Sequence, residues 1–242
     1  MRDTSVSFTQ KVKEEVATTP LQGDVARSFL SSFIQINGHI TIRNRETILT
    51  VETENAKIAK NVYMMVRERY GVSLNFSYRK KMKFDKKVCY VLQVNEGSDA
   101  ILNDLEIHLY EDKPMRTFLR KSENIRAFIA GAFLACGSCN DPHSSNYHLE
   151  IALQNEEFAS YLLSLVVRNR YIEFDMKMIQ RRKQCVLYLK KSDQISDFIA
   201  YIGAPDTRLR FEEIRVERDF HNNDNRLQIC DTANLKRTLS SS

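Results

Sequence analysis

The 242-residue sequence lacks any apolar run long enough to cross a lipid bilayer. Its longest apolar runs, such as residues 128–136, fall well short of the roughly 20 residues that a membrane-spanning helix needs. The N-terminus has no signal-peptide pattern. Five cysteines, an odd number, argue against a complete disulfide framework and are typical of a reducing compartment. We therefore expect a cytoplasmic globular protein that does not enter the membrane.

The sequence also lacks a large excess of one charge. Lys and Arg total 36 against 31 Asp and Glu, which gives a net charge of +5. The basic residues gather in two clusters, within residues 79–87 and 177–183. Such clusters attract nucleic acid, although a solvated hairpin explains either cluster alone. The candidate phosphate-binding residues are Arg79, Lys80, Lys81 and Lys83 in the first cluster, and Lys177, Arg181, Arg182 and Lys183 in the second.

Glycine is scarce as well, with only seven residues. None of them forms a P-loop, a nucleophile elbow or a dinucleotide-binding pattern. The acids Glu150, Glu156 and Glu157 suggest catalysis only weakly. We expect Glu150 on the open face of a strand and the other two at a helix N-terminus, where the helix dipole favours negative charge.

The chain contains an internal repeat. Residues 27–38 align with residues 126–137 at a constant offset of 99 residues, and arginine, phenylalanine and glycine recur in register. Each half then follows the same pattern, which predicts helix, strand, strand, helix, strand, strand and helix. Asn55 and Asn155 precede the middle helices and are predicted N-caps.

The expected elements follow from this pattern. Alternating residues predict strands at 47–52 and 147–151. The other predicted strands are 72–78, 88–94, 171–178 and 184–190, and the predicted helices after the aligned ones are 56–70, 99–109, 156–170 and 193–201. The predicted organisation is an N-terminal helical segment at 1–20 with its helix at 8–17, a first repeat at 21–110, a linker at 111–121, a second repeat at 122–205 and a further linker at 206–242.

The aligned segment at 129–137 is dense in alanine and glycine, which predicts close packing of two helices. This segment and the repeat pattern resemble the LAGLIDADG homing endonucleases. The resemblance implies an α/β (α+β) fold of two αββαββα repeats with pseudo-two-fold symmetry, whose sheets form a saddle on DNA. In that family the acid before the last glycine of each motif helps bind catalytic divalent metal ions.

Asn37 and Cys136 stand at those two acid positions. Neither supplies the anionic oxygen that magnesium prefers. We therefore expect no catalytic residue, no metal site and no cofactor. A surviving endonuclease remains an alternative that these two residues oppose.

Residues 7–15, 126–142, 147–151, 225–226 and 230–236 resemble the WhiA family of regulators. The resemblance implies a DNA-binding transcription regulator in sporulation, cell division and chromosome segregation, with a helix-turn-helix after the LAGLIDADG-like part. The chain ends at Ser242, so we expect 206–242 to lead toward a helix-turn-helix that is missing here. A single helix at 231–240 is all that we predict in this segment.

The expected partner is double-stranded DNA, bound by a monomer associated with the nucleoid. Arg43 and Arg45 are further, weaker candidates in the first repeat, and residues 140–143 replace them in the second, which would make the saddle electrostatically lopsided. Regulatory or cell-division proteins are possible additional partners. The alternative function is a protein-interaction scaffold whose sheets no longer bind DNA.

A zinc site is a further alternative, because Cys136, Cys139, His143 and His148 are four potential ligands. Their spacing is poor, since Cys139 lies only four positions before His143. A redox-active Cys-x-x-Cys pair is also conceivable. The favoured interpretation is that small residues fill a helix interface.

Overall fold

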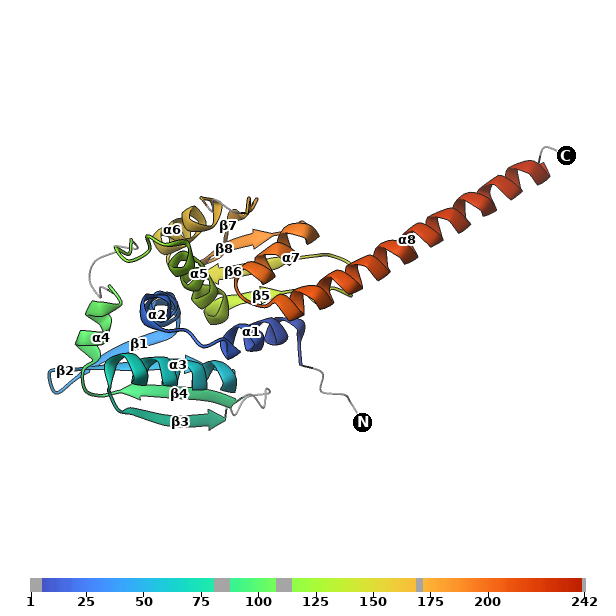
Figure 1. Ribbon diagram of the computed structural model, residues 1–242. Coiled ribbons are helices and arrows are strands. Elements are labelled where there is room, and N and C mark those ends of the chain that lie inside the picture. Colours follow the sequence, from blue (N-terminus) through green and yellow to red (C-terminus); the bar gives the residue numbers. More distant parts are fainter. Residues whose placement is uncertain (1–5, 81–87, 108–114, 169–171, 241–242) are drawn as a thin grey trace.

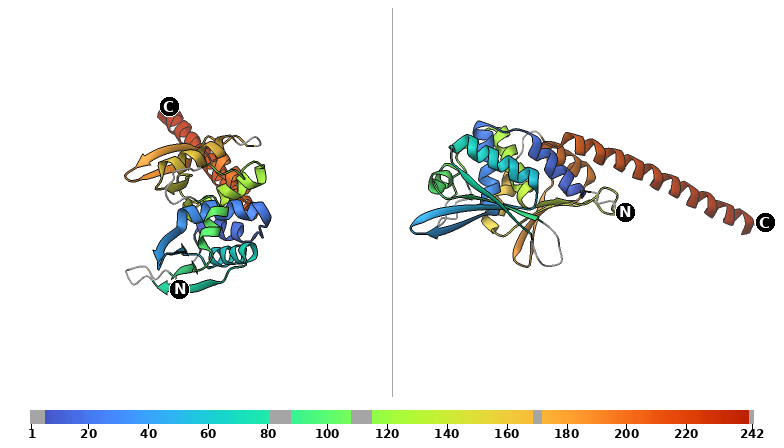
Figure 2. Two further views of the ribbon diagram at one scale, coloured as in Figure 1. Left: turned by 90° about the vertical axis from the view of Figure 1, so that its left-hand side faces the viewer. Right: turned by 90° about the horizontal axis from the view of Figure 1, so that it is seen from below.

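Two four-stranded antiparallel sheets lie side by side, and helices cover one face of both (Figures 1 and 2). The computed structural model describes residues 6–80, 88–107, 115–168 and 172–240. The first sheet has the strand order β1-β2-β4-β3 and the second has the order β5-β6-β8-β7. The predicted α/β (α+β) fold of two αββαββα repeats is confirmed.

The elements run in the predicted order in both repeats. The first repeat comprises α2 (Gly23–Asn37), β1 (Gly38–Arg43), β2 (Glu46–Thr53), α3 (Ala56–Tyr70), β3 (Leu74–Lys80), β4 (Val88–Val94) and α4 (Ser98–Asp104). The second comprises α5 (Ser122–Cys136), β5 (Gly137–Cys139), β6 (Leu149–Leu153), α6 (Glu156–Val167), β7 (Lys177–Arg181), β8 (Gln184–Leu189) and α7 (Ser192–Tyr201). The helix α1 (Phe8–Thr18) precedes them, as predicted.

Asparagine side chains cap the N-termini of the middle helices, α3 and α6. The side chain of Asn55 accepts hydrogen bonds from the amides of Lys57 and Ile58 at 2.9 and 3.1 Å. The side chain of Asn155 accepts one from the amide of Phe158 at 2.7 Å. Both predicted N-caps are therefore confirmed, and each satisfies amides that have no partner within the helix.

The helices α2 and α5, called the motif helices below, form the centre of the molecule. Buried phenylalanines line them, and the core continues from them to the inner faces of both sheets. In the first sheet, Leu49 and Val51 of β2 point into this core, whereas Glu52 lies on the opposite face. In the second sheet, Leu149 and Ile151 of β6 take the same inward positions.

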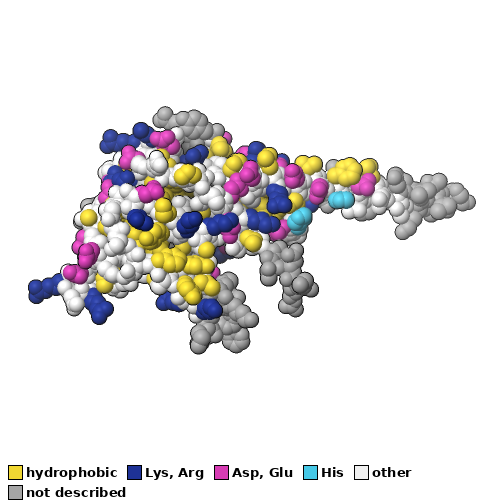
Figure 3. Space-filling view, turned by 60° about the horizontal axis from the view of Figure 1, so that its bottom comes forward, with side chains coloured by type: hydrophobic (Ala, Val, Ile, Leu, Met, Phe, Trp, Pro, Cys, Tyr) yellow, Lys and Arg dark blue, Asp and Glu magenta, His cyan; other side chains and the backbone are white. Residues whose placement is uncertain are grey.

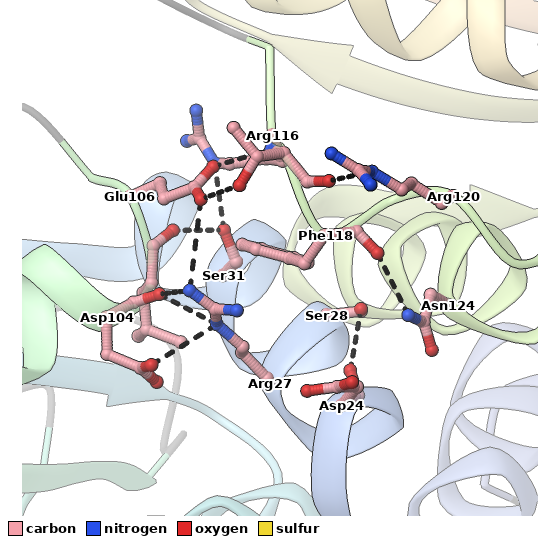
Figure 4. Close-up of polar contacts among 12 residues, drawn as sticks. Asp24, Arg27, Ser28, Ser31, Asp104, Glu106, Arg116, Phe118, Arg120 and Asn124 are labelled. Atoms are coloured by element: carbon pink, nitrogen blue, oxygen red, sulfur yellow. Dashed lines mark hydrogen bonds and ion pairs between the residues drawn. The ribbon is translucent and has the colours of Figure 1, made fainter.

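The predicted linker at 111–121 is a packed segment over its described part, residues 115–121 (Figure 4). Arg116 is only 5% exposed, and its guanidinium donates to Ser31 Oγ at 3.0 Å and to Gln35 Oε1 at 2.9 Å. Arg27 lies over the ring of Phe118 at 4.2 Å. The connection between the repeats is therefore held against α2.

Several predicted boundaries are wrong. The strand predicted at 171–178 is β7, which begins only at Lys177. The helix predicted at 99–109 ends at Asp104, and Glu106 shortly after it has a positive φ of 53°, which ends helical geometry. The strand predicted at 72–78 is shifted by two residues to β3. These errors concern element ends, which depend on tertiary packing as well as on local pattern.

The largest difference is the C-terminal segment. We predicted a helix only at 231–240, whereas α8 (Pro205–Ser240) is one continuous helix that projects from the body (Figure 1). Proline suits the first position of a helix. Glu15 of α1 accepts hydrogen bonds from the amides of Asp206 and Thr207, both at 2.8 Å, and so caps α8. Since no glycine or proline follows Pro205, nothing in the sequence interrupts the helix.

Among the described residues, no helix combines the length and the apolar character required to span a membrane.

Candidate nucleic-acid interface

The face of each sheet that the helices leave uncovered is called its open face below; the right-hand view of Figure 2 shows the helices on the opposite side. Because side chains alternate along a strand, the pairing register identifies the residues on this face. In the first sheet they include His39, Thr41, Arg43, Thr50, Glu52, Asn75, Ser77, Arg79, Cys89 and Gln93. In the second they include Ser138, Glu150, Lys177, Ile179, Arg181 and Tyr188.

Arg79 and Arg181 occupy equivalent positions in the two sheets. Gly38 and Gly137, which end the aligned segments, pair with Val51 and Ile151. Arg79 lies opposite Cys89, and Arg181 lies opposite Gln184. When residues are counted along the paired strands from the two glycine pairs, both arginines fall at the same position of their hairpins. Both arginines are exposed. The two basic clusters predicted from the sequence are therefore related by the internal symmetry at these positions.

Each of these arginines forms an ion pair with a glutamate on the second strand of its repeat. Arg79 pairs with Glu52, and Arg181 Nη1 lies 3.5 Å from Glu150 Oε2. The arginine side chains are 63% and 58% exposed, whereas the glutamate side chains are 25% and 27% exposed. The carboxylates therefore lie close to the sheet surface and the guanidinium groups lie outside them.

In the first sheet, the pKa shifts of Glu52 and Arg79 are those that an ion pair produces. Partial burial acts to raise the pKa of Glu52, but hydrogen bonding and the positive charge of Arg79 outweigh burial, so the pKa lies below its ordinary value. The pKa of Arg79 is raised by the same partner. In the second sheet, His148 Nε2 lies 3.0 Å from Glu150 Oε2, and its ring stacks on Tyr188 with 6.0 Å between the centroids.

The other described candidates of these two clusters lie at the ends of β3 and β7 and in the β7–β8 turn. Lys80 ends β3 and is exposed, and Lys177 lies 3.9 Å from Asp175. Arg182 and Lys183 form the β7–β8 turn, next to an open recess of about 1010 Å³. Lys81 and Lys83 lie outside the described residues.

The β1–β2 hairpin carries Arg43 and Arg45, both exposed. Basic side chains gather at the lower left end of the molecule in Figure 3, over this hairpin. In the second repeat, the corresponding connection contains Asp141, whose carboxylate accepts from the amide of His143 at 2.9 Å. Arg218 of α8 donates to the backbone oxygens of Pro142 and Ser145 in this connection, so a cation from another element lies beside it.

Asn37 and Cys136 end the two motif helices, at the positions where the resembling endonucleases carry acids. Burial raises the pKa of the Cys136 thiol to about 12, so the group is uncharged near neutral pH. A cavity of about 800 Å³ lies beside these helix ends, and its lining includes Asn37, Glu52, Glu54 and Lys13. Within the described part of the chain, no group of three or more His, Cys, Asp or Glu residues is placed to hold a metal ion.

Lys13 of α1 is the one cation among the described residues that line this cavity. Its ammonium nitrogen lies 5.9 Å from the centroid of the Phe133 ring. Burial lowers its pKa to about 8, against weaker opposing effects of Cys136 and Glu54. The N-terminal helix therefore brings a positive charge to the end of α5, a place that the sequence pattern alone did not indicate.

Three of the four potential zinc ligands have other partners, and the described residues contain no cluster that could hold a metal ion. The thiol of Cys139 contacts the backbone oxygen of Asn140 at 3.5 Å, and that of Cys136 contacts the backbone oxygen of Ala132 at 3.6 Å. His148 points to Glu150. The structure therefore does not bring these side chains together around a common point.

The sequence analysis missed two residues of the interface region, Lys13 and Glu52. Glu52 has a sequence signal, because it shares the alternation of residues 47–52 that places every second side chain on the open face. Lys13 has none, since its position depends on how α1 docks against α5. Glu150 lies on the open face of β6, as predicted.

Comparison with known proteins identifies two matching family models. The model described as the WhiA N-terminal LAGLIDADG-like domain matches residues 24–108, and the model described as the WhiA LAGLIDADG-like domain matches residues 125–221. A curated relative, "Probable cell division protein WhiA" from Bacillus subtilis (strain 168), is 36% identical over 241 residues, which cover 98% of this chain and 75% of the relative.

Solved structures show the same fold. Full-length DUF199/WhiA from Thermatoga maritima matches with a TM-score of 0.66 and 19% identity, over 94% of this chain and 74% of that one. The homing endonuclease I-DmoI in complex with DNA and Mn matches with a TM-score of 0.52 and 17% identity, over 74% of this chain and 96% of that one. The fold is thus shared with a protein whose structure was solved on DNA.

Proposed function

The chain belongs to the WhiA family, and from this premise we propose that it is a non-catalytic DNA-binding module of a transcription regulator that acts in cell division. The proposal extends to sporulation and chromosome segregation, the roles that the family resemblance implies. In this proposal the module acts as a monomer in the cytoplasm, associated with the nucleoid.

The equivalence of Arg79 and Arg181 is the observation that carries the DNA role. Two exposed arginines at matching places on two adjoining sheets can contact one duplex together, one in each half of a site. Lys80 and Arg182, the next residues along each hairpin, add positive charge at the same two places. Binding that depends on such contacts releases counterions from DNA and weakens as salt rises.

The absence of catalysis is proposed from Asn37 and Cys136. Metal-assisted cleavage of a phosphodiester needs hard anionic ligands for the divalent ion. An amide and an uncharged thiol at the ends of the motif helices do not provide them. DNA binding and DNA cleavage are therefore separable in this fold, and we propose that only binding is retained.

The test is fluorescence anisotropy of the full chain titrated into a labelled duplex at two salt concentrations. A variant in which Arg79, Lys80, Arg181 and Arg182 are all changed to Glu should bind far more weakly than the unmodified protein. The wild-type affinity should fall as salt rises, because phosphate contacts dominate.

A matched control reverses four cations elsewhere on the surface. Lys60, Arg67, Arg168 and Arg210 are exposed residues outside the open faces. Changing all four to Glu alters the net charge by the same amount, so equal losses in the two variants would indicate only a general charge effect. Failure of the unmodified chain to bind even at low salt would overturn the DNA role.

The second candidate is a protein-interaction scaffold. One observation favours it: Leu209, Val216, Phe220 and Leu227 of α8 are large apolar side chains that are 57–68% exposed. Retention of cell-division proteins by the immobilised chain, together with no DNA binding, would support this function instead.

A further inference from the structure

We infer that Glu52 and Glu150 are specificity-determining residues, which hold Arg79 and Arg181 for acceptors on base edges and disfavour their use by backbone phosphates. This inference rests on the proposed DNA role and concerns which part of the DNA the two arginines contact.

The arrangement occurs in both sheets. Arg79 reaches across β4 to Glu52 on β2, and Arg181 reaches across β8 to Glu150 on β6. The two glutamates are not at equivalent register positions, since Glu52 is paired with Val91 whereas Glu150 is paired with Tyr188. Both sheets therefore form an Arg–Glu ion pair, but the glutamate lies at a different position along the strand in each sheet.

Each carboxylate has a second partner besides its arginine. Glu52 Oε2 accepts a weak hydrogen bond from the Cys89 thiol, with 3.6 Å between sulfur and oxygen. Glu150 Oε2 has His148 Nε2 at 3.0 Å. Because only about a quarter of each glutamate side chain is exposed, a bound duplex would meet the carboxylate as a fixed feature of the sheet surface.

The guanidinium groups retain free donors. A guanidinium has five N–H donors in a planar fork, and one carboxylate engages only one edge of it. More than half of each arginine side chain is exposed, so the outer edge faces solvent. A second acceptor can therefore approach without breaking the ion pair.

The charge of this second acceptor decides whether the arginine contacts a phosphate or a base edge. A phosphate carries a full negative charge and is repelled by a carboxylate that shares the same guanidinium. The O6 and N7 atoms of guanine are neutral acceptors in the major groove, and arginine binds both at once. A fixed carboxylate also restricts the arginine side chain, which lowers the entropy lost when a base is bound. Guanine edges are therefore favoured over phosphates at these two positions.

The test compares the unmodified chain with the double variant Glu52→Gln and Glu150→Gln. Glutamine keeps the shape and removes the charge. Titrated with a labelled random-sequence duplex, the double variant should bind roughly tenfold more tightly, because two repulsive contacts disappear. The slope of log affinity against log salt should steepen by about one to two, since the freed arginines contact phosphates.

The control removes two acids from the helical side. Glu68 of α3 and Glu157 of α6 are exposed, and changing both to Gln alters the net charge equally. This control should leave the affinity and the salt slope close to those of the unmodified chain. A second readout is enrichment of sequences from a randomised duplex pool: the unmodified chain should select guanine at fixed positions, and the double variant should lose that preference.

The outcomes separate the two proposals. If the unmodified chain binds DNA and the double variant binds no more tightly than the Glu68 and Glu157 control, the inference is wrong and the DNA role stands. If none of the three proteins binds DNA at low salt, both the inference and the proposed function are wrong. A thermal unfolding midpoint for each variant shows whether it has kept its fold.

Discussion

Gly131 of α5 faces Ser32 of α2, and the two residues occupy equivalent positions in the repeats at the offset of 99 residues. A Cβ atom added to Gly131 would lie 2.3 Å from Ser32 Oγ and 2.4 Å from the backbone oxygen of Phe29. Both distances are shorter than van der Waals contact. The motif helices are therefore as close as they are only because one of the two positions has no side chain.

The change Gly131→Ala should lower the free energy of unfolding by about 1–3 kcal/mol, the usual cost of overpacking. Urea unfolding measures the effect. Adding Ser32→Ala should recover only part of the loss, because the clash with the Phe29 backbone remains. An unchanged unfolding free energy for Gly131→Ala would mean that the helices can separate without cost.

Arg116 should be important for joining the repeats. It is buried, and its guanidinium donates to Ser31 and Gln35 of α2. Its backbone N–H donates to the hydroxyl oxygen of Tyr161 of α6 at 3.2 Å. Arg116→Ala should lower the free energy of unfolding by about 2 kcal/mol, because the buried Ser31 hydroxyl loses a charged donor.

The matched control for Arg116 is Arg120, an exposed residue of the same segment that bonds to the backbone oxygen of Thr117 (Figure 4). Arg120→Ala should change the unfolding free energy little. Equal effects of the two substitutions in urea unfolding would contradict the role assigned to the buried arginine.

Lys13 should make stability depend on pH in the alkaline range. Burial lowers its pKa from 10.5 to about 8, so between these values the unfolded chain binds more protons than the folded one. The charged lysine therefore destabilises the folded protein most at pH values below about 8. This destabilisation disappears as the pH rises from about 8 to 10.5. Lys13→Met should stabilise the protein at neutral pH by up to roughly 3 kcal/mol, the equivalent of this shift.

Urea unfolding at pH 7 and pH 10 tests this prediction, with the difference between variant and unmodified protein as the measured quantity. The stabilisation by Lys13→Met should shrink at the higher pH. Lys11→Met, an exposed position on the same helix, serves as the control and should show no such trend. A difference that stays constant with pH would show that Lys13 titrates normally in the folded state.

Supercoiled plasmid incubated with the full chain and Mg²⁺ or Mn²⁺ should remain intact, because Asn37 and Cys136 cannot hold a catalytic metal ion. Gel electrophoresis, with an active nuclease as positive control, detects nicked and linear products. Nicking that depends on the divalent ion and copurifies with the protein would contradict the non-catalytic proposal.

The sequence by itself determined the repeat architecture. The offset between Arg27 and Arg126, the N-caps Asn55 and Asn155, and the alternation in the strands are local signals, because each depends on residues within one or two turns or strands. They were sufficient for the order of elements and for placing the basic clusters in hairpins. Even the length of α8 had a local signal, in Pro205 and the absence of any later glycine or proline.

Only the tertiary structure decided which charged groups meet. Arg79 and Glu52 are 27 residues apart, Arg116 and Ser31 are 85 apart, and Glu15 caps a helix 191 residues later. Lys13 is half-buried only because α1 docks against the rest of the molecule. Pairings of this kind depend on the relative placement of whole elements, and no local periodicity encodes that placement. Arg79 and Arg181 stand out in the sequence as members of basic clusters, and only the fold shows that Glu52 and Glu150 pair with them.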